Sequence, residues 1–286
     1  MIKGSIVALV TPMTADGAIH WDQLADLVEW HIASGSNALV AVGTTGESAT
    51  LHKDEHLAVI KFITERVAKR IPIIAGAGGN STAEAIELAT ASYHIGCDAT
   101  LQVTPYYNKP PQRGLAAHYR AIAAAVPMPH ILYNVPSRTG CDLKPETVRE
   151  LATVANIIGI KEASNYERLE ELSRTVPPGF LVYSGEDGLA SRALVNGLID
   201  GVISVTANVA PALMAALMAN IGRAEALNER LAPLHETLFC ESNPLPVKWA
   251  LHRLGKIDPG IRLPLVPLAP EKQALVEAAL HHAGLL

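Results

Sequence analysis

SIVALVTP, residues Ser5–Pro12, opens the chain with a short apolar run that ends in a threonine and a proline. Runs of this length that are bounded by turn-forming residues are typical of buried β-strands. Helical stretches with apolar residues at helical spacing follow such runs, as in Asp22–Ile32 and Ala83–Ile95. Further strand-like runs occupy Ala38–Gly43, Ile71–Ala77, Ala99–Thr104, His130–Val135, Ile157–Lys161, Phe180–Ser184 and Gly201–Val205.

About eight units of strand followed by helix are what a (β/α)₈ TIM barrel requires. Hydrophobic residues make up 49% of the chain and aromatic residues only 5%, so Val, Ile, Leu and Ala must fill the core. That composition suits a parallel sheet that is covered on both faces. An open doubly wound sheet also alternates strands and helices, but the number of units favours the barrel, and no GxGxxG fingerprint is present.

The C-terminal part of the chain is longer than one closing helix requires. Residues 211–286 are rich in Ala, Leu and Met and have a helical pattern. We therefore expect two parts: a catalytic barrel domain at residues 1–223 and a small helical domain at residues 224–286.

Charge and cysteine content exclude several classes of protein. A net charge of −5 argues against nucleic acid, which requires a basic face. Cys97, Cys141 and Cys240 are too few and too scattered for a disulfide framework or a zinc cluster, and we expect buried thiols. His52 and His56 are four residues apart but suggest no third ligand. No signal stretch or membrane-spanning run is apparent. We expect a cytoplasmic protein without a metal, cofactor or membrane partner.

Lys161 is the most informative polar residue, because the run Ile157–Ile160 leads directly into it. The active site of such a barrel lies at the carboxyl ends of its strands. An amine held in an apolar barrel loses its proton more readily, and the neutral amine is the nucleophile that forms a Schiff base. The alternative is an exposed lysine, or one paired with Glu162.

Other strand ends carry groups that complement an amine. Tyr133 ends the fifth run and can relay protons; otherwise it is a core tyrosine. Thr44 and Thr45 lie between glycines in a turn that suits a carboxylate, or else merely cap the next helix. Arg138 can bind a carboxylate through two hydrogen bonds, or is a surface arginine. Adjacent Tyr106 and Tyr107, after the fourth run, must point in different directions.

Taken together, these strand ends resemble the dihydrodipicolinate synthase/N-acetylneuraminate lyase family, from Ile2 to Leu286. Each matching motif is a weak signal by itself, but five motifs in the family's order are specific to the family. The motifs are GTTGES (43–48), VTPYYN (103–108), YNVPSRTG (133–140), IKEA (160–163) and NPLPVK (243–248).

The resemblance implies a reaction and roles for its residues. Among family members, the chain is most similar to those that condense pyruvate with L-aspartate 4-semialdehyde, the first committed step of lysine biosynthesis by the diaminopimelate route. Lys161 would form the imine with pyruvate. Tyr133, Thr44 and Tyr107, the last from a neighbouring subunit, would relay protons. The remaining implied positions are Thr45 for the pyruvate carboxylate, Arg138 for the semialdehyde carboxylate, and Gly185 and Ile203 in the pocket wall.

The resemblance also implies assembly and regulation. The family is usually a homotetramer built as a dimer of tight dimers, and many bacterial members are inhibited by L-lysine at the tight-dimer interface. Lys53 departs from the histidine that is common in lysine-sensitive relatives. The positions that match the lysine site are Ser48, Ala49, Lys53, His56, Asn80, Glu84 and Tyr106.

Two alternatives remain open from the sequence. One is an aldolase of the same family that acts on a 2-keto-3-deoxy sugar acid or on N-acetylneuraminate; Thr44 and Thr45 together with Arg138 argue against it. The other is a non-enzymatic pyruvate-binding regulator, against which the intact set of Lys161, Tyr133 and Thr44 argues. Fold alone decides neither question.

Overall fold

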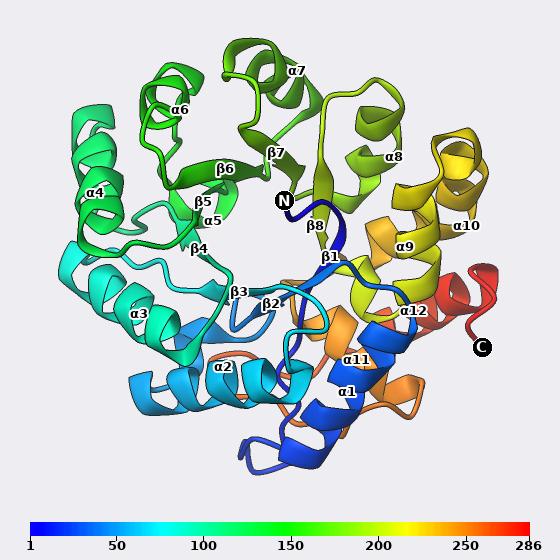
Figure 1. Ribbon diagram of the computed structural model, residues 1–286. Coiled ribbons are helices and arrows are strands. Elements are labelled where there is room, and N and C mark those ends of the chain that lie inside the picture. Colours follow the sequence, from blue (N-terminus) through cyan, green and yellow to red (C-terminus); the bar gives the residue numbers. More distant parts are fainter.

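A computed structural model describes residues 1–286 as a closed barrel of eight parallel strands, β1 to β8 in sequence order (Figure 1). The predicted TIM barrel is confirmed. The strands end within a few residues of the predicted runs, because Thr, Pro and Gly leave the sheet to begin the turns. Their bounds are β1 Gly4–Ala8, β2 Ala38–Ala41, β3 Ile73–Gly76, β4 Ala99–Val103, β5 His130–Asn134, β6 Ile157–Glu162, β7 Leu181–Ser184 and β8 Gly201–Ser204.

Helices form a ring around the sheet, as Figure 1 shows, and their apolar faces cover it. The predicted helices Asp22–Ile32 and Ala83–Ile95 correspond to α1 (Trp21–Ala33) and α3 (Thr82–Ile95). The other helices around the barrel are α2 Lys53–Val67, α4 Gln112–Ala125, α5 Pro136–Thr139, α6 Pro145–Leu151, α7 Tyr166–Thr175, α8 Asp187–Val195 and α9 Pro211–Ala219.

Two apolar clusters hold the fold together. The larger lies between the sheet and the helices and includes Leu132 and Ile160. The smaller fills the inside of the barrel and includes Ile6, Ile131 and Tyr183. This separation follows from the strands, because successive side chains point to opposite faces of the sheet.

Three helices follow the barrel: α10 (Ala224–Thr237), α11 (Leu245–Arg253) and α12 (Pro270–His282). Helix α10 packs against α8 and α9, and α12 packs against α10 and α11. The segment between α10 and α11 reaches the mouth of the barrel, where Phe239 and Asn243 line a cavity. None of the helices is long and apolar enough to cross a lipid bilayer.

Candidate active site

Lys161 lines a cavity of about 770 Å³ at the carboxyl ends of the strands. The residue is only 6% exposed, and its Nζ lies 4.2 Å from the centre of the Tyr133 ring. Tyr133 and Lys161 are register partners on β5 and β6. The alternative that Lys161 pairs with Glu162 is wrong, since the Glu162 carboxylate binds Asn134 instead. The structure thus leaves the amine facing the cavity.

Gly185 makes room for the lysine side chain. A Cβ atom at this position would lie 2.9 Å from Lys161 Cε and 2.7 Å from Ala163 Cβ. Both distances are shorter than real Cβ contacts, so any larger residue would displace the lysine or the strand that carries it. Gly185 also lines the cavity, in the position that the sequence predicts for it.

The turn after β2 presents backbone donors to the cavity. Val42 and Glu47 have positive φ angles of 55° and 59° and fold the segment tightly. The N–H groups of Gly46 and Glu47 bond within the turn, whereas those of Thr44 and Thr45 bond to no other backbone group. Both threonines line the cavity beside Lys161. Free N–H groups in such a turn are suited to bind a carboxylate.

Arg138 approaches the same cavity from α5, the short helix that follows β5. Its Nη2 donates a hydrogen bond to the carbonyl oxygen of Asn243 at 3.3 Å. The Asn243 side chain donates to Thr45 Oγ1 at 2.9 Å. The segment before α11 therefore joins the arginine to the threonine turn, which gives the NPLPVK motif a structural role.

Glu186 is a cavity residue that the sequence reasoning missed. Burial and the neighbouring Asp187 carboxyl raise the pKa of Glu186, while Lys161 and Arg138 act to lower it. A carboxyl that faces two cationic groups can receive an ammonium group of a substrate. Its position directly after Gly185, at the end of a predicted strand, was the available signal.

Two predicted residues lie apart from this cavity. Tyr107 is 90% exposed, on the loop after β4, with a φ angle of 71°. Within one chain its hydroxyl is not brought to Lys161. Ile203 is fully buried inside the barrel, and Val205, two residues further along, lines the cavity instead.

A second cavity, of about 540 Å³, adjoins the first and shares Thr44 and Arg138 with it. The buried His56 donates a hydrogen bond from Nε2 to Gly76 O at 2.7 Å, and burial lowers the pKa of His56. Lys53 forms an ion pair with Glu87. Asn80 lies beside the cavity and donates to Tyr106 O at 3.2 Å. Of the predicted lysine-site positions, the lining includes Ser48, Ala49, Lys53, His56, Glu84 and Tyr106.

The fold and the site define a class of protein, a (β/α)₈ barrel with a buried, unpaired lysine amine at the carboxyl ends of its strands. Such an amine is suited to form covalent imines with carbonyl substrates. The chain belongs to the dihydrodipicolinate synthetase family, whose model matches residues 1–283. The family resemblance inferred from the strand-end motifs is confirmed.

Relatives match this chain over nearly their whole length. A 4-hydroxy-tetrahydrodipicolinate synthase from Dichelobacter nodosus is 57% identical, with 100% of this chain and 98% of the relative covered. A crystal structure of chloride-inhibited dihydrodipicolinate synthase from Acinetobacter baumannii, complexed with pyruvate, matches with a TM-score of 0.98 and 53% identity over 100% of both chains. A lysine-bound enzyme from Cyanidioschyzon merolae matches with a TM-score of 0.95 and 40% identity, over 100% of this chain and 99% of that one.

Proposed function

We propose that this chain is a Schiff-base lyase that condenses pyruvate with L-aspartate 4-semialdehyde. This is the activity of a 4-hydroxy-tetrahydrodipicolinate synthase, the name carried by its 57% identical relative. The observation that carries the proposal is the buried Lys161 amine, which faces a cavity of about 770 Å³ beside Tyr133 and the threonine turn. The reaction is the first committed step of lysine biosynthesis by the diaminopimelate route.

The proposed chemistry begins when the Lys161 amine attacks the keto carbon of pyruvate and water leaves, forming an imine. Loss of a methyl proton gives an enamine, whose carbon attacks the aldehyde carbon of the semialdehyde. The amino group of the adduct then attacks the imine carbon and displaces the lysine. The cyclic product leaves, and the amine is regenerated.

The geometry supports a role for each neighbouring group. Thr44, Thr45 and Arg138 line the cavity. The N–H groups of the two threonines would bind the pyruvate carboxylate, and Arg138 would bind the semialdehyde carboxylate. Tyr133 and Thr44 would carry protons to and from the imine, with Tyr107 completing the relay from a second copy of the chain. Glu186 would bind the ammonium group of the semialdehyde. Gly185 would shape the wall of the pocket.

Borohydride reduction in the presence of pyruvate tests the covalent step. We expect a pyruvyl adduct on Lys161 by peptide mass spectrometry, together with turnover of aspartate semialdehyde. An adduct without that turnover would keep the imine and move the assignment to a sugar-acid aldolase. Absence of an adduct would overturn the proposal and favour a non-catalytic pyruvate-binding protein. Lys161→Arg, which keeps the charge, is the matched control and should give no adduct.

The second cavity would bind L-lysine as a feedback inhibitor. Glu84 offers a carboxylate to an ammonium group, and the shared residues Thr44 and Arg138 connect the cavity with the proposed active site. The lysine-bound relative supports this assignment. A lysine titration should inhibit wild type and affect Glu84→Gln less. No inhibition of wild type at millimolar lysine would contradict it.

The exposed Tyr107 supports a proposal about assembly. A tyrosine that is 90% exposed in one chain would be covered if a second copy packed against this loop and received it into its own cavity. The full arrangement would be a homotetramer, a dimer of tight dimers. Each chain would also consist of two domains, a catalytic domain at residues 1–223 and a helical domain at residues 224–286.

A further inference from the structure

Strands β5 and β6 carry a buried polar pair on the opposite side of the sheet from Tyr133 and Lys161. Tyr133 is the register partner of Lys161, and Asn134 is the register partner of Glu162. Because successive residues of a strand point to opposite faces, the second pair faces outward, toward the helices. The next outward positions on the same strands, Leu132 and Ile160, are apolar. The polar pair therefore occurs only at the level of the reacting groups.

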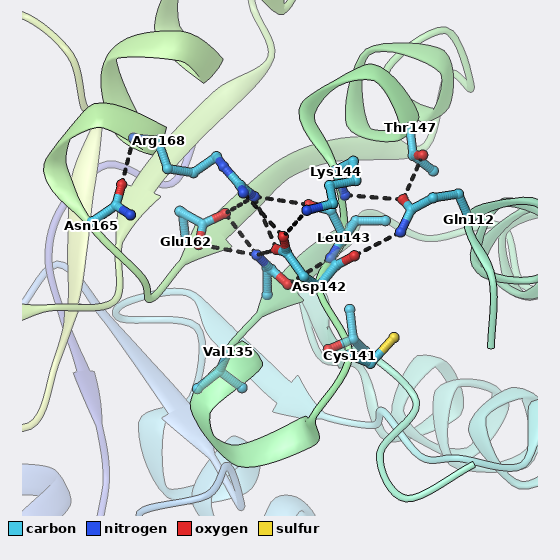
Figure 2. A network of polar contacts seen from close by, with 12 residues as sticks. Gln112, Val135, Cys141, Asp142, Leu143, Lys144, Thr147, Glu162, Asn165 and Arg168 are labelled. Carbon is cyan, nitrogen blue, oxygen red and sulfur yellow. Dashed lines mark hydrogen bonds and ion pairs between the residues drawn. The ribbon is translucent and has the colours of Figure 1, made fainter. Parts of the chain in front are cut away.

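The two side chains of this outer pair are hydrogen-bonded to each other. Asn134 Nδ2 donates to both carboxylate oxygens of Glu162, at 3.1 Å each. Arg168 Nη1, from α7, lies 3.9 Å from Glu162 Oε2. Figure 2 shows the Glu162 carboxylate beside the guanidinium of Arg168, which also contacts Asp142. A carboxylate that accepts two bonds along one edge fixes the spacing of the two strand ends.

The network continues to the segment that follows Arg138. Asn134 Oδ1 accepts the Leu143 N–H at 2.9 Å, and Asn134 Nδ2 also donates to Asp142 Oδ1 at 2.9 Å. The guanidinium of Arg168 holds both oxygens of Asp142, at 3.0 and 3.1 Å (Figure 2). Asn134 thus ties the end of β5 to the chain that leaves α5, the helix that carries Arg138.

Burying the Glu162 carboxylate at this position costs free energy. Its side chain is fully buried, and burial raises the pKa of Glu162 to about 7, although Asn134 and Arg168 lower it. The other groups around it are Asp142, which raises the pKa, and the hydroxyl of Ser164, which lowers it; Lys144 pairs with Asp142. Apolar residues would fill such a position at lower cost, so the pair contributes something other than stability.

We propose that Asn134 and Glu162 are positioning residues, which set the distance between Lys161 and Tyr133 and hold the Arg138 segment against the cavity. This inference rests on the proposed function of Lys161. Neither residue touches a substrate. They act through the strand ends that carry the reacting groups, and the ionised Glu162, which can accept both Asn134 bonds, is the productive form.

Four variants test the pair: Glu162→Met, Asn134→Leu, the double variant, and the conservative Glu162→Gln, whose amide oxygen still accepts a hydrogen bond. We expect roughly 10- to 100-fold lower kcat for the first two, because small misplacements of reacting groups are costly. The KM for pyruvate should change less than about threefold. The double variant should be no worse than the worse single one. Glu162→Gln, which keeps one acceptor oxygen but not the charge, should lose less kcat than Glu162→Met.

The readout separates positioning from stability and from the proposed function itself. Active sites are counted by borohydride-trapped pyruvate, so kcat refers to folded, reactive protein, and single-turnover trapping gives the rate of imine formation. Glu146→Gln, an exposed glutamate of α6, is the matched control and should behave as wild type. Variants that trap pyruvate at the wild-type rate with unchanged kcat per site would overturn the inference. Wild type that traps no pyruvate would instead overturn the proposed function.

If the methionine and leucine variants do not fold, Glu162→Gln carries the test through pH. The ionised Glu162 is the productive form in this proposal, so kcat should rise with pH near 7, where Glu162 loses its proton. We expect that rise in wild type and its loss in Glu162→Gln. The same rise in both proteins would assign it elsewhere, for example to Glu186, and overturn the inference.

Discussion

Gly185 is a single residue whose missing side chain is part of the proposed site. Gly185→Ala would place a Cβ 2.9 Å from Lys161 Cε and push the amine from its position. We expect imine formation with pyruvate to slow by roughly 10-fold or more. Single-turnover trapping measures this directly.

Gly188→Ala is the matched control for Gly185→Ala. A Cβ at residue 188 would meet nothing nearer than His235 Cβ at 4.0 Å, and alanine favours the helix α8 in which it lies. We expect wild-type trapping from this variant. Equal rates for both alanine variants would show that Gly185 is not required for close approach.

Glu162 should lower the free energy of unfolding as pH rises, whereas a carboxyl with a lowered pKa has the opposite effect. A carboxyl whose folded pKa is raised to about 7 favours folding while it is protonated, and this contribution is lost as pH rises from the unfolded value of 4.5 through 7. Glu162→Gln cannot ionise. Its free energy of unfolding relative to wild type should therefore increase by on the order of 2 kcal/mol between about pH 5 and about pH 8. Urea unfolding at both pH values checks this, and no change would contradict a titrating Glu162.

Single residues were predictable from the sequence where a strand pattern ended in a reactive group. Lys161, Tyr133, Thr44 and Arg138 meet at one cavity because all lie at or just beyond the ends of predicted strands. Glu186 was missed although it follows a predicted strand end, and Asn243 was missed because its approach depends on how a loop packs. The outward direction of Glu162 follows from strand alternation alone and could have excluded its pairing with Lys161.

Among the elements, α11 is fastened to the turn after β2 by a buried ion pair between Lys248 and Glu47. Burial lowers the pKa of Lys248, and Glu47 partly offsets this effect. Lys248→Met leaves the Glu47 carboxylate buried without this partner, and we expect a loss of about 3 kcal/mol in the free energy of unfolding. Urea unfolding at fixed protein concentration measures it.

Adding Glu47→Gln to Lys248→Met removes both charges and should recover at least part of the loss, because a neutral pair has no unpaired buried charge. Lys61→Met, which removes one partner of the exposed pair Lys61–Glu65, is the control and should change stability by less than about 1 kcal/mol. An equal loss from both lysine variants would contradict the role given to burial.

Elements were predicted more completely than their connections. Apolar runs gave all eight strands, since a barrel buries both faces of each strand. The contact of the NPLPVK segment with the barrel was not predictable, because it joins residues such as Asn243 and Thr45 that lie far apart in the chain. The domain division at residues 223 and 224 stays a prediction.

For the whole molecule, the proposed exchange of Tyr107 between copies predicts complementation. Lys161→Ala and Tyr107→Ala should each be nearly inactive. A hybrid dimer of the two has one site with an intact lysine and an intact tyrosine from its partner. After unfolding and refolding an equal mixture, we expect about a quarter of wild-type activity, since about half of the dimers are hybrids with one good site each. Refolding each variant alone is the control, and a mixture no more active than its components would contradict exchange.

The back-to-back arrangement of the two residue pairs on β5 and β6 also bears on enzyme engineering. Mutagenesis aimed at a new aldehyde acceptor would randomise positions on the cavity side, such as 138 and 186. Libraries that also vary 134 and 162 would mix changes in acceptor preference with general losses of rate. Holding those two positions constant should raise the fraction of functional clones and make the selected changes easier to interpret.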